Sequence, residues 1–329
     1  MLDYPLITVR SSSGLTSVNH CGTHLLTTSS TGDLCQWDRQ SGNAVSLWRT
    51  KQNLVSALPL ESHGSTSYER VALQHSNGVY IFDLHSESVL EEFDISVSNF
   101  ARIRLIPQNP PLLVCPSGLS DIICHDIRVP YLEKDASDGY SKNNAVKTGP
   151  ENGITLSMSS DEFGSLQNIE PLPYLGSDYI LSTYECGSIC LFDLRNSQRP
   201  LFTSDVCKGA EAFPSLAVWR SVALVGDTKG EAHMLNVSKS AGFKLLYRRT
   251  LNDEDPGSCV AGCLRIRDDG AVTVACCWDN SIRLFETRSL SMKALCNEHK
   301  DNITDIHFHG STGEFATCGM DGNAHVWKI

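Results

Sequence analysis

The stretch that decides the fold is EFATCGMDGNAHVWK, residues Glu314 to Lys328. Apolar and polar residues alternate on both sides of Met320-Asp321-Gly322, which predicts two antiparallel strands joined by a tight turn. The second strand closes on the bulky side chain of Trp327. A strand pair of this kind exposes a free edge unless neighbouring strands cover it, so we expect related segments elsewhere in the chain.

Six upstream segments repeat this pattern of a turn, an alternating strand and a closing bulky apolar residue. The residue that follows the bulky apolar one is usually acidic and ends the segment. These last residues are Asp38, Asp83, Asp126, Asp193, Asn236 and Glu286. With Lys328 as the seventh end, five of the six intervals are 42–50 residues, and the interval from Asp126 to Asp193 is 67. Four-stranded propeller blades repeat every ~40–45 residues. The sequence therefore predicts an all-β chain, a single seven-bladed β-propeller over residues 1–329, with a pair of β-sandwiches as the alternative.

Two departures from the repeat predict how the ring closes and where it is interrupted. The last repeat has only three strands, and the alternating segment Pro5–Arg10 can supply its missing outer strand. The long interval contains residues 129–152, which are rich in Ser, Asn, Gly, Asp and Lys. We expect them to form a disordered loop between the third and fourth strands of blade three. Alternation resumes at Ile154, where the fourth strand of that blade is expected.

The composition excludes several classes of partner. The formal net charge is −11, whereas nucleic-acid interfaces and docking on anionic membranes need clustered Lys and Arg. The N-terminus lacks the pattern of a signal peptide, and no apolar run approaches the ~18 residues of a membrane span. The 13 cysteines are odd in number and lie mostly in apolar strands, which favours free thiols in a reducing compartment. We expect a protein of the cytoplasm and the nucleus.

The last repeat closely resembles a WD repeat. The resemblance implies a hydrogen-bonded tetrad of His299, Thr317, Asp321 and Trp327 that holds the fold. Such a network is physically reasonable, because a buried indole N–H and a buried carboxylate each need a partner. The other repeats lack parts of this set, so we expect their stability to depend on apolar strand faces.

Two further motifs resemble one WD-repeat family, the G-protein beta-subunit-like proteins, whose fungal members are called ASTRA-associated protein. They are Tyr-Glu-x-Gly-Ser-x-x-x-Phe-Asp, from Tyr184 to Asp193, and Trp-Asp-x-x-Ile-Arg-x-Phe, from Trp278 to Phe285. The resemblance implies a non-enzymatic adaptor, acting as a monomer within a larger complex. It would work with the triple-T co-chaperone complex in the maturation of phosphatidylinositol-3-kinase-related kinases. We predict no binding of a G-protein gamma subunit, because the few residues before the first blade contain no heptad pattern.

Candidate contact residues come from two predicted turns between second and third blade strands, which open on one face of a propeller. Trp278, Asp279 and Arg283 belong to one of them, and Tyr184 and Glu185 to the matching turn two blades earlier. Because Trp and Arg are enriched at interaction hot spots, we predict a protein-binding surface here. The alternative is that Trp278 packs on the neighbouring blade and Arg283 pairs with Asp279.

Enzyme signatures are absent from the sequence: it has no nucleophile elbow, no phosphate-binding loop and no His-Glu-x-x-His motif. We therefore predict no catalytic residue, no cofactor and no metal. His307 and His309 share one strand face, but a metal there would need a third ligand. Two other functions stay open. One is a substrate receptor of a cullin-RING ubiquitin ligase, because Asp126 to Arg128 and Asp193 to Arg195 resemble its Asp-x-Arg box. The other is a propeller hydrolase such as a methylesterase.

Overall fold

The computed structural model describes most of the chain. The described residues are 4–61, 68–108, 111–127, 146–148, 153–158, 161–196, 199–204, 212–252, 254–255, 257, 259–310 and 313–329. Within these ranges the structure is all-β apart from one turn of 3-10 helix, Asp161–Phe163. No helix among them is long and apolar enough to cross a membrane.

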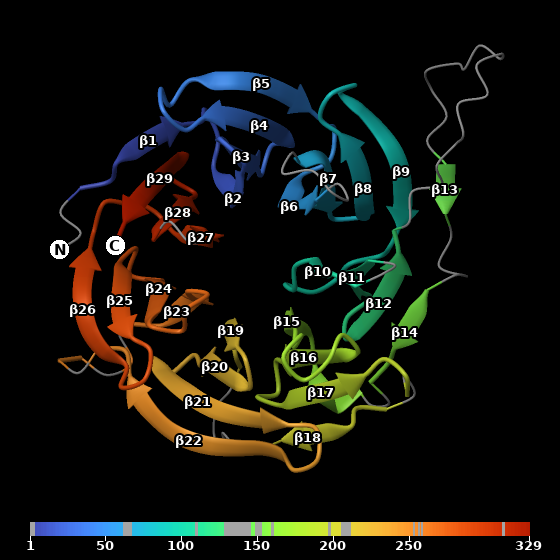
Figure 1. Ribbon diagram of the computed structural model, residues 1–329, viewed down its shortest axis with the longest axis vertical. Coiled ribbons are helices and arrows are strands. Elements are labelled where there is room, and N and C mark those ends of the chain that lie inside the picture. The colour runs from blue at the N-terminus through green and yellow to red at the C-terminus, as the bar shows by residue number, and fades with distance from the viewer. Residues whose placement is uncertain are drawn as a thin grey trace.

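Seven antiparallel sheets stand around a central axis as the blades of a propeller (Figure 1). In the first six blades the first strand in sequence order lies innermost, whereas in the last blade the N-terminal strand lies outermost. The first three blades are β2 (Leu15–Cys21), β3 (His24–Ser29), β4 (Asp33–Asp38) and β5 (Ala44–Arg49); β6 (Leu54–Glu61), β7 (Tyr68–His75), β8 (Gly78–Asp83) and β9 (Ser88–Asp94); and β10 (Arg104–Ile106), β11 (Leu112–Ser117), β12 (Asp121–Asp126) and β14 (Ile154–Leu156).

The remaining four blades complete the ring. They are β15 (Leu166–Pro171), β16 (Tyr179–Tyr184), β17 (Ile189–Asp193) and β18 (Phe202–Ser204); β19 (Ser215–Trp219), β20 (Val222–Gly226), β21 (Glu231–Ser238) and β22 (Gly242–Thr250); β23 (Ala261–Ile266), β24 (Val272–Cys277), β25 (Ile282–Glu286) and β26 (Ser291–Cys296); and β27 (Ile303–His309), β28 (Glu314–Gly319), β29 (Asn323–Lys328) and β1 (Ile7–Arg10).

The predicted closure by the N-terminal strand is confirmed. β1 pairs antiparallel with β29 from Ile7 opposite Val326 to Arg10 opposite Asn323. Its buried residue Val9 packs in a cluster that joins blade seven to blade one. The pairing of the first and last strands thus covers the sheet edge that the C-terminal strand pair would otherwise expose.

The core is divided among the blade interfaces. Buried apolar residues of the described chain form seven clusters, and each cluster combines side chains from two successive blades. Alternation along the strands explains this arrangement, because each sheet presents one face to the blade before it and one to the blade after it. The ring is therefore held by packing between blades, as expected for repeats that have lost polar networks.

The insertion is placed in part. Ile154–Leu156 is β14, which pairs with β12, so the predicted fourth strand of blade three is confirmed. The range 129–152 was predicted to be a disordered loop, but Val146–Thr148 forms β13, which pairs in parallel with β9. The prediction is corrected for these three residues, because they extend the sheet of blade two. The rest of the range lies outside the described residues.

Candidate protein-binding site

The tetrad of blade seven is assembled as predicted. Trp327 Nε1 donates to Thr317 Oγ1 (3.0 Å), and Thr317 Oγ1 lies 2.9 Å from His299 Nε2. His299 Nδ1 lies 3.1 Å from an Asp321 carboxylate oxygen. Burial lowers the pKa of His299, which favours the neutral ring. A neutral ring protonated on Nδ1 donates to Asp321 and accepts the Thr317 hydroxyl proton, so every polar group in the chain of four has a partner.

Blade one keeps a fragment of the same network. Trp37 Nε1 donates to Thr27 Oγ1 at 2.8 Å, and both side chains are buried. Thr27 makes this one side-chain bond, whereas Thr317 makes two. The sequence signal for this pair is the Trp before Asp38, which ends the first repeat as Trp327 ends the last.

The two predicted binding turns have the same backbone geometry. Tyr184 N–H donates to Ser188 O in one turn, and Cys277 N–H donates to Ser281 O in the other (3.0 and 2.9 Å). By this register Trp278 corresponds to Glu185, one position after the strand ends. Side chains on successive strand residues point to opposite faces, so this single position separates a buried residue from an exposed one.

Tyr184 therefore differs from the prediction. Its side chain is fully buried between blades three and four, and its hydroxyl donates to Ser120 O at 3.2 Å. A buried ring cannot contact a partner, so the predicted binding role of Tyr184 is corrected to a core role. Glu185 is exposed, and its Oε2 accepts bonds from the backbone N–H and the hydroxyl of Ser165 (3.0 and 2.9 Å). These bonds lower the pKa of Glu185.

Arg283 does not lie on a binding surface as predicted but pairs with Asp279, which was the alternative. It is buried, Nη2 pairs with Asp279 Oδ2 at 2.8 Å, and Nε donates to Ser281 Oγ at 3.1 Å. Burial raises the pKa of Asp279, but its bonds to Ser281 and Arg283 outweigh burial and lower it. Arg283 and Asp279 thus fix the conformation of the turn that carries Trp278, and Arg283 is not a contact surface.

Trp278 is exposed to 54% and lies over Gly262 of its own blade. A Cβ at position 262 would come within 2.9 Å of Trp278 Nε1, so Gly262 leaves room for the indole. The side chain lines a hollow of about 460 Å³ at the mouth of the central channel. Glu185 lines the same hollow, together with Phe100, which is 76% exposed. We call this hollow, bounded by Phe100, Glu185 and Trp278, the funnel.

Phe100 was not among the contact residues predicted from the sequence. It lies between β9 and β10, in a segment that connects two blades. Large apolar side chains at such positions are normal when they pack inward, and only the structure shows that this one faces the funnel. Two exposed aromatic side chains on one hollow are a feature of interaction sites in soluble proteins.

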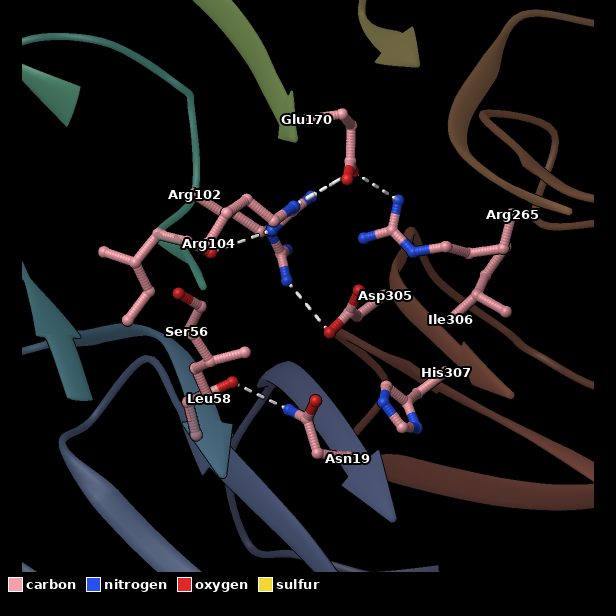
Figure 2. Close-up of a pocket in the computed structure, with 12 residues that line it drawn as sticks. Asn19, Ser56, Leu58, Arg102, Arg104, Glu170, Arg265, Asp305, Ile306 and His307 are labelled. Atoms are coloured by element: carbon pink, nitrogen blue, oxygen red, sulfur yellow. Dashed lines mark hydrogen bonds and ion pairs between the residues drawn. The ribbon is translucent and has the colours of Figure 1, made fainter. Parts of the chain in front are cut away.

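Below the funnel, charged side chains from distant parts of the sequence meet around the axis (Figure 2). Arg104 Nε and Nη2 donate to Glu170 Oε1 at 2.9 and 2.7 Å, and Arg265 Nη1 reaches the same oxygen at 3.2 Å. Arg102 pairs instead with Asp305 at 3.0 Å. No sequence motif marks this cluster, because its members come from blades three, four, six and seven.

Groups of metal-ligating residues in the described chain are engaged with protein partners. Asp279, beside Cys259 and Cys277, is paired with Arg283, and both nitrogens of His299 are used by the tetrad. In a third group, Asp227 pairs with His233 at 2.8 Å and accepts two backbone N–H bonds in the turn of blade five. These contacts account for each group as a fold-stabilising network.

The pair His307 and His309 does gain a third imidazole, that of His20, with ring centroids 5.6 and 4.8 Å away. However, His307 Nδ1 already accepts the backbone N–H of His20 at 3.2 Å.

In the second Asp-x-Arg box, Arg195 folds back on Asp193, with Nη2 2.6 Å from Oδ2, although the arginine itself is exposed. Arg128 of the first box lies outside the described residues.

Comparisons with known proteins agree with this architecture. A family model described as WD domain, G-beta repeat matches residues 291–328, which run from β26 to β29. The chain is similar in structure to the beta-propeller domain of Cps50 (Swd1) from Myceliophteria thermophila. The TM-score is 0.74 and the identity 14%, and the superposition covers 98% of this chain and 100% of that one. The predicted seven-bladed propeller with a WD repeat is therefore confirmed.

Proposed function

We propose that the chain is a non-enzymatic adaptor whose protein partner docks on the funnel. A WD-repeat propeller supports the role of a protein-interaction scaffold. The observation that carries the proposal is the pair of exposed aromatic side chains, Phe100 and Trp278, on one hollow at the channel mouth. Aromatic anchors at the centre of an interface typically contribute ~2 kcal/mol or more each to binding.

The turn beneath Trp278 supports the same proposal. Arg283, Asp279 and Ser281 hold it through buried and partly buried bonds, so the indole is presented on a rigid element. A rigid anchor loses little conformational entropy when a partner binds, which favours affinity. The adaptor reading also fits the absence of a nucleophile hydrogen-bonded to a histidine among the described residues that line the funnel.

We further propose the partner and place of action that the family resemblance implies. The chain would act with triple-T co-chaperone components in the maturation of phosphatidylinositol-3-kinase-related kinases, in the cytoplasm and nucleus. Of the motif residues that suggested the resemblance, Trp278 lines the funnel and Asp279 pairs with Arg283 in the turn that carries it. A substrate receptor of a cullin-RING ligase and a hydrolase are the competing functions.

The test is affinity purification followed by mass spectrometry from cells that express the full chain or a Phe100→Ala, Trp278→Ala double variant. A matched control carries Leu246→Ala and Met292→Ala, which remove exposed apolar side chains from outer strands β22 and β26. We expect triple-T components with wild type and control, and a loss of about 1000-fold in affinity for the double variant, from ~2 kcal/mol for each of the two aromatic side chains. Recovery of cullin adaptors without triple-T components, or an unaffected double variant, would refute the proposal.

A further inference from the structure

The charged cluster in the channel is not neutral. Glu170 Oε1 is shared by two guanidinium groups, those of Arg104 and Arg265, while Arg102 and Asp305 form a separate pair. Three cations thus face two carboxylates. His307, which lines the same hollow, adds no charge at pH 7, because burial lowers its pKa to about 4. One positive charge remains in this hollow, in a protein whose formal net charge is −11. Glu185 lines the adjoining funnel instead, where its carboxylate accepts two bonds from Ser165.

This excess charge is largely withdrawn from solvent. The side chains of Arg104, Arg265 and Glu170 are 17%, 28% and 13% exposed. A partly buried charge without a counter-ion is costly, because little water remains to solvate it. The cluster lines a hollow of about 220 Å³, and Figure 2 shows the guanidinium of Arg265 reaching into it toward Glu170.

The hollow lined by the charged cluster opens into the funnel, where the partner is proposed to dock. Arg102, Arg104 and Arg265 line both this hollow and the funnel above it, so the two are continuous. Arg265 donates from Nη1 to Glu170 and to Leu264 O. Its Nε and Nη2 form the edge of the fork that donates two parallel bonds to a carboxylate.

We propose that the channel binds the carboxylate of an aspartate or glutamate side chain, carried by a protein segment that docks across Phe100 and Trp278. A carboxylate supplies the single negative charge that the cluster lacks, whereas a phosphate near pH 7 would bring up to two. The aromatic pair holds the segment, and the arginines select an acidic residue within it. This inference rests on the proposed function and specifies the chemistry of its partner.

The probe is a phage-displayed library of random 12-residue peptides, selected on the full chain. We expect selected peptides to share an Asp or Glu beside apolar residues. For one such synthetic peptide, acid-to-amide replacement should weaken binding to wild type about 10-fold or more, and less than about 2-fold in the Arg265→Gln variant. Arg265→Lys, which keeps the charge but loses the fork, should fall between them.

A second variant guards against a folding defect in Arg265→Gln. Glu170→Gln leaves Arg104 and Arg265 without their shared carboxylate, so it should bind the acidic peptide more tightly than wild type does. Misfolding would not strengthen binding. Peptides without an acidic preference that still need Trp278 would overturn the inference and leave the proposed function standing. Tighter binding of a phosphoserine peptide than of the glutamate peptide would also overturn it, and a selection that yields no binder would overturn both.

Discussion

Replacing Thr317 by valine tests whether the blade-seven tetrad acts as one unit. The substitution keeps the side-chain shape and removes the hydroxyl that accepts from Trp327 Nε1 and contacts His299 Nε2. Both neighbours are buried and would each lose a partner. An unsatisfied buried polar group costs about 1–3 kcal/mol, so with two such groups the free energy of unfolding should fall by about 2–6 kcal/mol.

Thr27→Val is the matched control, because Thr27 is equally buried but accepts a single bond, from Trp37. It should cost about half as much. With an unfolding entropy of about 2.1 cal/mol/K per residue over 329 residues, Thr317→Val should lower Tm by roughly 3–9 °C. Urea titrations at pH 7.5, monitored by tryptophan fluorescence, measure both variants. Equal losses in the two variants, or a loss below about 0.5 kcal/mol at Thr317, would show that the tetrad is not a stabilising unit.

Three further predictions follow from the fold. Deleting residues 1–10 should unfold the protein or make it oligomerise, since β29 loses its partner strand; a monomer with unchanged Tm, measured by light scattering and calorimetry, would contradict this. Stability should fall as the pH drops from about 6.5 toward 4, because burial lowers the pKa of His20 to about 2 and that of His325 to about 4. The unfolded chain then takes up these protons first, which costs about 1.4 kcal/mol per pH unit for each histidine, and urea midpoints independent of pH would disprove it. Cys186 is exposed, whereas burial raises the pKa of Cys115, so Cys186→Ser should remove a fast-reacting thiol from a native titration and Cys115→Ser should not.

Regular features of the fold could be predicted because they repeat. Each blade buries both sheet faces against its neighbours, so strand alternation and spacing are imposed seven times along the chain. The closing role of Pro5–Arg10 followed from counting strands in the last repeat, and the tetrad followed from the one repeat that keeps the full signature. These inferences depend on local pattern, which a single sequence contains.

The binding surface depends on contacts that local pattern does not encode. Tyr184 and Glu185 are adjacent in the sequence, yet one lies in the core and the other on the funnel, because the strand ends between them. From local pattern alone, both residues are expected on the surface. Arg283 lies at a strand position where a bond to Asp279 satisfies its charge, so a residue type common at hot spots is used to hold a turn.

The channel cluster shows how ring closure and binding chemistry depend on each other. Arg102 pairs with Asp305 of blade seven and also donates to the carbonyls of Thr16 and Thr304, so it spans the axis between blade three and the two blades joined at closure. Asp305 in turn accepts the backbone N–H of Val18 in blade one. If Asp305 were displaced, Arg102 would lose its carboxylate and the channel would gain a second unbalanced positive charge. Although β1 does not line the funnel, a weakened closure should therefore alter the affinity and the selectivity of the funnel before the protein unfolds.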